Sequence, residues 1–219
     1  MRLALFGPPG AGKGTQARLL TERLALTQIS TGDLFRAALR DETPVGLKAK
    51  SYMDRGALVP DAVVNEMVGE ALAAVGYDDF ILDGFPRTVD QAAWLDDDLR
   101  AHGAPLDAVV SLVVEHEVVV QRLSRRRTDR ATGAIYHLDF NPPPPGLPAE
   151  RLHHRSDDQP DAIRKRLLVY EDETAPVEAF LRERAPYVRV EGIGEIEAVH
   201  ARILDGLRKA GVRGVSTPA

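Results

Sequence analysis

The sequence predicts an α/β protein built around a parallel β-sheet, and three observations lead to this class. Short apolar runs, typical of buried strands, recur at residues 2–6, 80–82, 108–114 and 187–190. Longer stretches with helical periodicity separate these runs. A glycine-rich segment, GPPGAGKGT at residues 7–15, directly follows the first run. Repeated strand–helix units favour a parallel sheet with helices on both faces, and such sheets bind ligands beyond the carboxyl ends of their strands.

Helices are expected wherever apolar residues recur with helical spacing. The predicted helices cover residues 12–24, 32–40, 45–55, 61–74, 89–102, 117–126, 160–171, 176–184 and 195–209. Two stretches interrupt the alternation and are interpreted as insertions: residues 30–60, which are helical without a strand, and residues 127–159. The second contains NPPPPG at 141–146 and lacks helical periodicity, which is typical of a mobile flap. The last residues, 212–219, are expected to fray as a flexible tail.

The composition limits the possible classes of function. The chain has 219 residues, enough for one domain with insertions, and no apolar stretch approaches the ~18 residues of a membrane span. The N-terminus shows neither a secretory nor a transit signal, so a soluble, cytoplasmic protein is expected. The absence of cysteine excludes disulfides and thiolate zinc sites. A net charge of −5 argues against broad nucleic-acid binding.

The glycine-rich segment has the composition of a phosphate-binding loop. Its glycines allow backbone N–H groups to converge on phosphate oxygens, and the N-terminus of the following helix adds donors and partial positive charge. Lys13 contributes a full positive charge. The usual pattern has a hydroxyl directly after the lysine, whereas here Gly14 intervenes before Thr15. A simple strand–helix turn is the alternative.

A carboxylate at the end of the second apolar run is a candidate magnesium ligand. The run FILDG at residues 80–84 ends in Asp83. In phosphate-loop proteins magnesium is shared between a loop hydroxyl, here Thr15, and such an aspartate, directly or through water. The alternative is an aspartate that only caps a turn before Gly84.

A cluster of arginines indicates a second anion-binding region. Residues 122–130 contain five arginines and one acidic residue, a local charge of +4 in an acidic protein. Planar guanidinium groups bind phosphate oxygens in pairs, so a polyphosphate would compensate this charge. For any single arginine here, such as Arg125 or Arg127, a solvated helix face is the alternative.

Several motifs occur together in the order of a known family. They are GPPGAGKGT at 7–15, ISTGDLFR at 29–36, LDGFPRTVDQ at 82–91, YHLDFNPP at 136–143 and RSDD at 155–158. With these motifs the chain resembles the long-lid adenylate kinases from Met1 to about Leu207. In that family glycine also follows the lysine and threonine comes next.

The resemblance implies a P-loop three-layer α/β/α fold with a five-stranded parallel sheet. It also implies a division of the chain into core (1–29, 60–122 and 160–211), an insertion that binds the nucleoside monophosphate (30–59), and a lid (123–159). The reaction it implies is magnesium-dependent transfer from ATP to AMP, giving two ADP. A monomer that binds neither nucleic acid nor membrane is expected.

The resemblance also implies roles for individual residues. Catalytic roles fall to Lys13, Arg87, Arg126, Arg155 and Arg166. ATP-binding positions are Gly10, Ala11, Gly12, Lys13, Gly14, Thr15, Arg122, Arg126, Tyr136 and Gly194. AMP-binding positions are Thr31, Arg36, Met53, Ala57, Val59, Gly84, Arg87, Gln91, Arg155 and Arg166. Asp157 and Asp158 match an acidic pair at the edge of the lid.

The predicted lid departs from the family pattern. Many bacterial members have four cysteines that bind zinc, and this chain has none, so no structural zinc is expected. Asp129 and Thr132 occupy the first pair of those positions, as in relatives with a hydrogen-bonded polar cluster. Pro145 and Pro148 fall about where the second pair of polar partners should lie, which leaves that half of the cluster unassigned.

Other functions compete with ATP:AMP phosphoryl transfer. Within the same class, the donor could be GTP or the acceptor UMP or CMP. Gln91 favours AMP, because an amide both donates to and accepts from the adenine edge. A catalytically silent nucleotide-binding regulator would not need the arginines at every matching position. A phosphate-loop ATPase linked to nucleic acid is disfavoured by the acidic charge.

Overall fold

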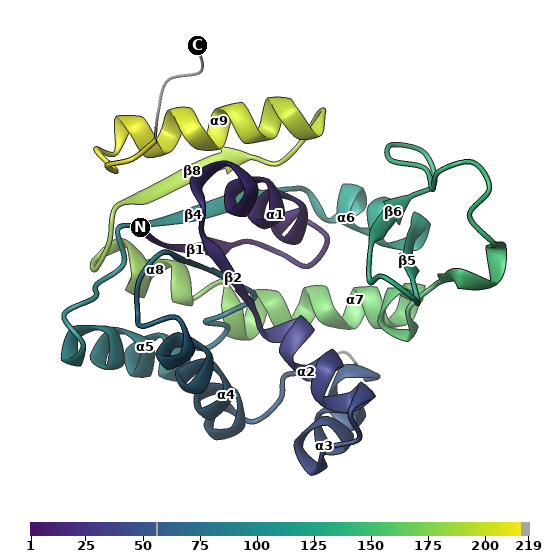
Figure 1. The fold of residues 1–219 in the computed structure, drawn as a ribbon, viewed down its shortest axis with the longest axis horizontal. Coiled ribbons are helices and arrows are strands. Elements are labelled where there is room, and N and C mark those ends of the chain that lie inside the picture. Colours follow the sequence, from purple (N-terminus) through teal and green to yellow (C-terminus); the bar gives the residue numbers. More distant parts are fainter. Residues whose placement is uncertain (56, 216–219) are drawn as a thin grey trace.

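A five-stranded parallel sheet forms the centre of the protein in a computed structural model that describes residues 1–55 and 57–215 (Figure 1). The strand order is β2-β3-β1-β4-β8, and all neighbours pair in parallel. The strands are β1 (Arg2–Phe6), β2 (Thr27–Ser30), β3 (Phe80–Asp83), β4 (Ala108–Val113) and β8 (Tyr187–Glu191). The predicted fold class and four of these five strands are thereby confirmed.

Strand β2 has too little apolar sequence to be found from its pattern. Its residues are TQIS, of which only Ile29 and Ser30 are buried. It lies at the edge of the sheet and pairs only with β3, where Ile29 lies opposite Leu82. An edge strand needs few apolar side chains, because one of its sides has no neighbouring strand.

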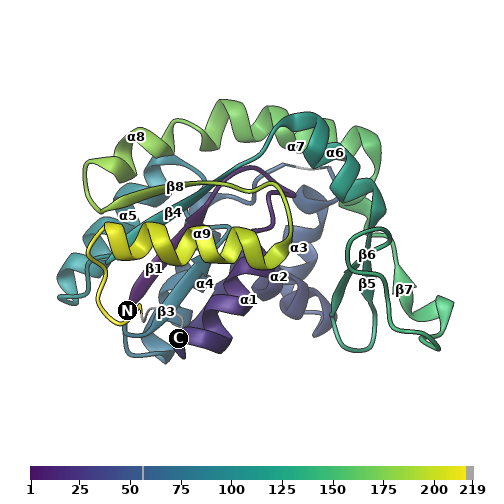
Figure 2. The same ribbon diagram turned by 90° about the horizontal axis from the view of Figure 1, so that it is seen from above.

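Helices cover both faces of the sheet (Figure 2). Their bounds are α1 (Lys13–Leu24), α2 (Thr31–Arg40), α3 (Pro44–Met53), α4 (Asp61–Ala74), α5 (Val89–Ala101), α6 (His116–Arg125), α7 (Pro160–Val169), α8 (Val177–Arg182) and α9 (Ile196–Lys209). Each of these nine α-helices of the described residues corresponds to a predicted helix. The helix predicted over 160–171 becomes a π-helical turn at Tyr170–Thr174.

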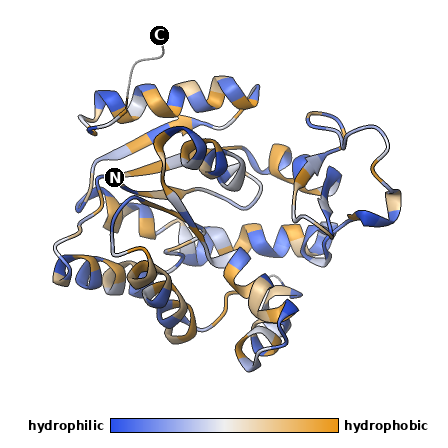
Figure 3. Ribbon diagram, viewed as in Figure 1, coloured by the Kyte–Doolittle hydropathy of each residue, from blue (hydrophilic) through white to orange (hydrophobic). Residues whose placement is uncertain are grey.

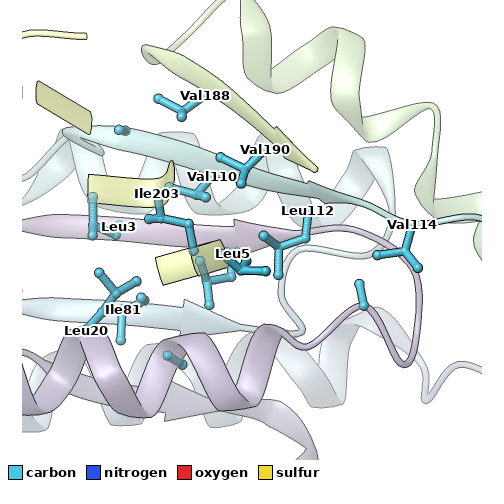
Figure 4. Close-up of a cluster of buried hydrophobic side chains, with 14 of the residues drawn as sticks. Leu3, Leu5, Leu20, Ile81, Val110, Leu112, Val114, Val188, Val190 and Ile203 are labelled. Carbon is cyan, nitrogen blue, oxygen red and sulfur yellow. The ribbon is translucent and has the colours of Figure 1, made fainter. Parts of the chain in front are cut away.

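Successive residues of β1 point to opposite faces of the sheet and enter two separate apolar cores. Leu3 and Leu5 pack with Leu20 of α1 and Ile203 of α9 (Figure 4). Ala4 and Phe6 belong to a second cluster with residues of α4, α5 and α8. In Figure 3 the central strands are largely apolar, and the surrounding helices alternate between polar and apolar residues. This pattern fixes the sheet between two helical layers.

Two insertions project from the core on different sides of the sheet's carboxyl edge (Figure 1). Helices α2 and α3 form one of them. The other contains a small antiparallel sheet, in the order β6-β5-β7, whose strands are β5 (Arg126–Asp129), β6 (Ile135–His137) and β7 (Leu152–His153). The insertions meet where Ser156 Oγ donates a hydrogen bond to Asp54 Oδ1 at 3.0 Å. No strand was predicted in the second insertion, because its strands span only two to four mainly polar residues.

The segment after α9 differs from the frayed tail expected from residue 212. Val215 is buried in the first apolar cluster, and Val212 packs against the same cluster. Apolar contact therefore holds residues 212–215 on the core, and residues 216–219 lie outside the described part of the chain. Within residues 1–55 and 57–215, no helix is long and apolar enough to cross a lipid bilayer.

Candidate active site

The loop between β1 and α1 has a backbone that only glycine adopts readily. Gly7 has a φ of +131°, and a Cβ there would lie 2.4 Å from the backbone oxygen of Leu112. Gly12 caps α1 with a φ of +98° in the left-handed region. The loop thus presents the N-terminus of α1 and its unpaired N–H groups to the cavity above the sheet.

Lys13 lies inside the curve of this loop. Its Nζ donates hydrogen bonds to the backbone oxygens of Gly7, at 2.7 Å, and Pro8, at 2.8 Å. Burial, together with the nearby arginines and against the attraction of Asp83, lowers the pKa of Lys13 to about 7. The charged ammonium is therefore short of anionic partners, and a phosphate group would supply them.

The position of Asp83 explains why a glycine follows the lysine. A Cβ on Gly14 would lie 3.3 Å from Asp83 Oδ2, so a larger side chain at residue 14 would crowd the carboxylate. The hydroxyl occurs instead at Thr15, which lines the same cavity. Burial raises the pKa of Asp83, whereas Lys13 and Arg87 oppose that shift. Gln28 Nε2 donates to Asp83 Oδ2 at 3.2 Å, an interaction that no sequence motif predicts.

Seven arginines line one cavity together with Lys13, and five of them come from segments other than α1 and α6. The cavity has a volume of about 1180 Å³. The five are Arg36 on α2, Arg87 after β3, Arg126 on β5, Arg155 after β7 and Arg166 on α7. Such a concentration of cations in an acidic protein favours a polyanionic ligand.

Two of these arginines are fixed by aspartates at the edge of the small sheet. Arg126 makes two hydrogen bonds to the fully buried Asp158, at 2.8 and 2.7 Å. Arg166 Nη1 donates to Asp157 Oδ2 at 2.9 Å. These pairs hold the guanidinium groups in place and leave other N–H donors of each arginine for a ligand.

The other three are held by single acceptors. Arg87 Nε donates to the backbone oxygen of Gly84 at 2.7 Å, Arg155 Nε to Thr128 Oγ1 at 2.9 Å, and Arg36 Nη2 to an exposed aspartate, Asp33, at 2.6 Å. Burial and neighbouring arginines lower the pKa of Arg87 and of Arg155 to about 10. Both remain charged at neutral pH.

Comparison with known proteins identifies the family to which this site belongs. The family model described as "Adenylate kinase" matches residues 5–185. An adenylate kinase of Salinibacter ruber is 53% identical over 207 residues, covering 94% of this chain and 98% of the relative. Another, from Carboxydothermus hydrogenoformans, is 45% identical over 214 residues, covering 95% and 100%. This chain belongs to the adenylate kinase family.

The catalytic, nucleotide-binding and magnesium positions implied by the adenylate kinase resemblance all lie on the wall of this cavity, whereas Asp158 of the acidic pair is buried outside it. These residues are Gly10, Ala11, Gly12, Lys13, Gly14, Thr15, Thr31, Arg36, Met53, Ala57, Val59, Asp83, Gly84, Arg87, Gln91, Arg122, Arg126, Tyr136, Arg155, Arg166 and Gly194. Their contacts with particular nucleotide atoms stay predictions. Leu58, Ile135 and Phe140 also line the cavity, and the sequence offered no signal that distinguishes them from ordinary apolar residues.

Two arginines hold the loop at residues 192–194, which lines the cavity, by donating hydrogen bonds to its backbone oxygens. Arg122 Nη2 donates to the oxygen of Gly192 at 2.8 Å, and Arg202 Nη2 to that of Ile193 at 2.5 Å. A Cβ on Gly192 would lie 2.7 Å from Val114 Cγ2, so this loop packs closely on the sheet. The Arg202 contact was not anticipated, because nothing in its helical context distinguishes it.

Arg151 completes a polar cluster in the second insertion. Thr132 Oγ1 donates to Asp129 Oδ2 at 2.8 Å, and Arg151 binds both oxygens of the same carboxylate, with Nε at 3.0 Å. Hydrogen bonds from Arg151 hold the pKa of Asp129 well below its usual range. One arginine beyond the proline run thus replaces the polar partners that Pro145 and Pro148 do not supply.

Proposed function

We propose that this chain catalyses reversible transfer of the γ-phosphoryl group of ATP to AMP, giving two ADP. The observation that carries the proposal is the convergence of Lys13 and five arginines on one cavity that extends from Gln91 to Gly194. The names of the similar proteins support the same reaction. ATP would bind at the loop of residues 7–15, and AMP between α2, α3 and Gln91.

The charges around the cavity match what this reaction requires. The second pKa of a phosphate monoester is near ~6, so the AMP phosphate is mostly dianionic at neutral pH and needs no general base. The protein must bring two repelling polyphosphates together in line and stabilise the charge of the transferred group. Lys13, Arg126 and Arg166 would contact the transferred group, while Arg36 and Arg87 would hold the AMP phosphate.

The residues near Lys13 fit a magnesium ion that is bound mainly through substrate phosphates. Magnesium in such sites is typically held by one or two protein oxygens, substrate phosphates and water. Thr15 provides a hydroxyl, and among the residues that the structure describes, only Gln28 donates a hydrogen bond to the Asp83 carboxylate. Bound there, magnesium would neutralise charge on the β- and γ-phosphates. No structural zinc is proposed in the lid, where Arg151, Thr132 and Asp129 bind one another.

The insertions provide the movement that the reaction needs. We assign residues 30–59 to the AMP side and 123–159 to the lid, with 1–29, 60–122 and 160–211 as core. Closure of such lids is the established means by which adenylate kinases exclude water from phosphoryl transfer. We further propose that the protein acts in the cytoplasm as a monomer.

A product-ratio assay separates this function from its alternatives. Protein, Mg²⁺, ATP and AMP are mixed, and ADP is expected at two molecules per AMP consumed. Release of inorganic phosphate would indicate an ATPase, and no turnover a silent regulator. Repeating the assay with GTP, UMP and CMP measures the selectivity, which we expect to favour ATP and AMP.

Arg87→Ala should abolish most turnover while its melting temperature stays near that of the wild type, and near-normal rates would remove Arg87 from the site.

A further inference from the structure

Gln91 has an amide whose two ends are bound by groups of opposite polarity. The residue lies in the first turn of α5, is 1% exposed and lines the cavity. Its Oε1 accepts a hydrogen bond from the backbone N–H of Arg87 at 2.7 Å. Its Nε2 donates to Asp61 Oδ1, also at 2.7 Å.

These two partners determine which way the amide points. A backbone N–H can only donate and an ionised carboxylate can only accept, so exchanging the amide oxygen and nitrogen would lose both hydrogen bonds. In the observed orientation, one N–H of Nε2 and one lone pair of Oε1 remain for a ligand. A ligand in the cavity would therefore find the donor and the acceptor of Gln91 in a fixed arrangement.

Asp61 is itself fixed by a second interaction. It is the first residue of α4, and its Oδ2 accepts from Thr88 Oγ1 at 2.7 Å. The same Thr88 oxygen accepts the backbone N–H of Gln91 at 3.0 Å and so caps α5. Asp61, Thr88 and Gln91 thus form a closed ring of hydrogen bonds that joins α4 to α5.

We propose that Asp61 is a positioning residue that, together with the backbone N–H of Arg87, fixes the direction of the Gln91 amide and so favours adenine as the acceptor base. The inference rests on the proposed function, which places the AMP base beside Gln91. Adenine presents an acceptor at N1 next to a donor at its amino group, whereas hypoxanthine presents a donor at N1 next to a carbonyl acceptor. The fixed amide complements adenine, and only a rotated amide would complement hypoxanthine in the same pose.

The test compares AMP with inosine monophosphate as acceptor. We expect Asp61→Leu, which removes the acceptor for Nε2, to raise the KM for AMP and to lower the AMP:IMP ratio of kcat/KM by about tenfold. The KM for ATP should not change. Asp61→Asn keeps one acceptor oxygen and should recover most of the lost ratio. Asp90→Leu makes the same change as Asp61→Leu at an exposed position in the first turn of α5 and serves as the matched control.

An unchanged AMP:IMP ratio in folded Asp61→Leu would overturn the inference. A second measurement avoids dependence on that variant: in the wild type, hydrogen exchange of the Gln91 side-chain amide should be much slower for one of its two protons. Fast exchange of both protons would also overturn it. A wild-type protein that forms no ADP from AMP would instead refute the proposed function, and the amide-exchange result would still decide the orientation of Gln91.

Discussion

Arginines on the same helix differ in what holds their side chains. On α7, the side chain of Arg166 is 19% exposed and faces the cavity, where Asp157 binds it. Two positions earlier, Arg164 is 69% exposed and pairs with the fully solvated Asp161. Surface pairs of this kind contribute little to stability, whereas a cation held in a cavity can stabilise developing negative charge.

This contrast gives a matched pair of substitutions. Arg166→Ala is expected to lower kcat by about 10²-fold or more, because it removes a preorganised cation from the transferred phosphoryl group. Arg164→Ala should leave kcat within about twofold of the wild type, because its charge is screened by water. Steady-state kinetics on both variants, with thermal melting as a check of folding, would test this. Equal effects of the two substitutions would contradict the assignment.

The lowered pKa of Lys13, about 7, predicts uptake of protons on ATP binding. Burial disfavours the ammonium in the free protein, and the triphosphate anion should restore its pKa toward the usual value. Near pH 8, where the terminal phosphate of ATP has already lost its proton, binding should therefore take up protons. Calorimetry in buffers of different ionisation enthalpy measures this uptake. Lys13→Arg remains charged at that pH and should show none, so equal uptake by both proteins would rule out Lys13 as the source.

At the residue scale, the sequence predicted charges better than it predicted their partners. Lys13 and the cavity arginines belong to recognisable motifs, and all of them line one cavity. Asp61, Gln28 and Arg151 act through hydrogen bonds to residues 22 to 55 positions away. No local pattern encodes such pairs, because the fold alone brings them together.

At the scale of elements, two helical glycines differ in how closely their helices approach neighbouring elements. Gly206 on α9 faces β8, and a Cβ there would lie 2.3 Å from Val188 Cγ1. Gly69 on α4 has room, since a Cβ would lie 3.5 Å from the ring of Trp94. The same substitution is therefore expected to have opposite effects in these two helices.

Gly206→Ala should lower the free energy of unfolding by about 1–3 kcal/mol, because the branched Val188 side chain cannot move aside without strain. Gly69→Ala should raise it by about 0.5–1 kcal/mol through its higher helix propensity. Urea unfolding followed by circular dichroism would measure both. A stabilised Gly206→Ala variant would show that α9 shifts freely on the sheet.

Elements with a full apolar face were predictable, and those that depend on pairing were not. Within residues 1–55 and 57–215, the nine α-helices have periodic sequence and four strands are continuous apolar runs, whereas β2 and the three strands of the second insertion are short and largely polar. Their hydrogen-bond partners lie elsewhere in the chain, as when Thr128 pairs with both Ile135 and His153. Residues 212–215 likewise stay on the core through two valines in a segment that otherwise has the composition of a tail.

At the scale of the whole molecule, one cavity extends from the proposed AMP base site to the proposed ATP base site. Gln91, Gly194 and the cavity arginines all line it. A single molecule that fills both halves would lose translational and rotational freedom once, whereas two separate nucleotides would each lose theirs.

We therefore expect two adenosines joined through five phosphates to bind at least about 10²-fold more tightly than AMP alone. One molecule should bind per chain, as measured by calorimetry. Two adenosines joined through two phosphates cannot span the same cavity and should lack this gain. Binding of two pentaphosphate molecules per chain would mean that the donor and acceptor sites are separate.

The hydrogen bond from Ser156 to Asp54 gives the two insertions a common boundary. If each insertion opened independently, the two ADP molecules would depart at unrelated times. Because this bond joins the two insertions, opening of one of them loosens the other. We therefore expect egress of both products to be nearly synchronous. In Ser156→Ala, stopped-flow fluorescence of labelled ADP should then resolve two release phases where the wild type shows one. Joint departure of the two products, set by a contact outside the nucleotide sites, is the expected consequence of this single bond.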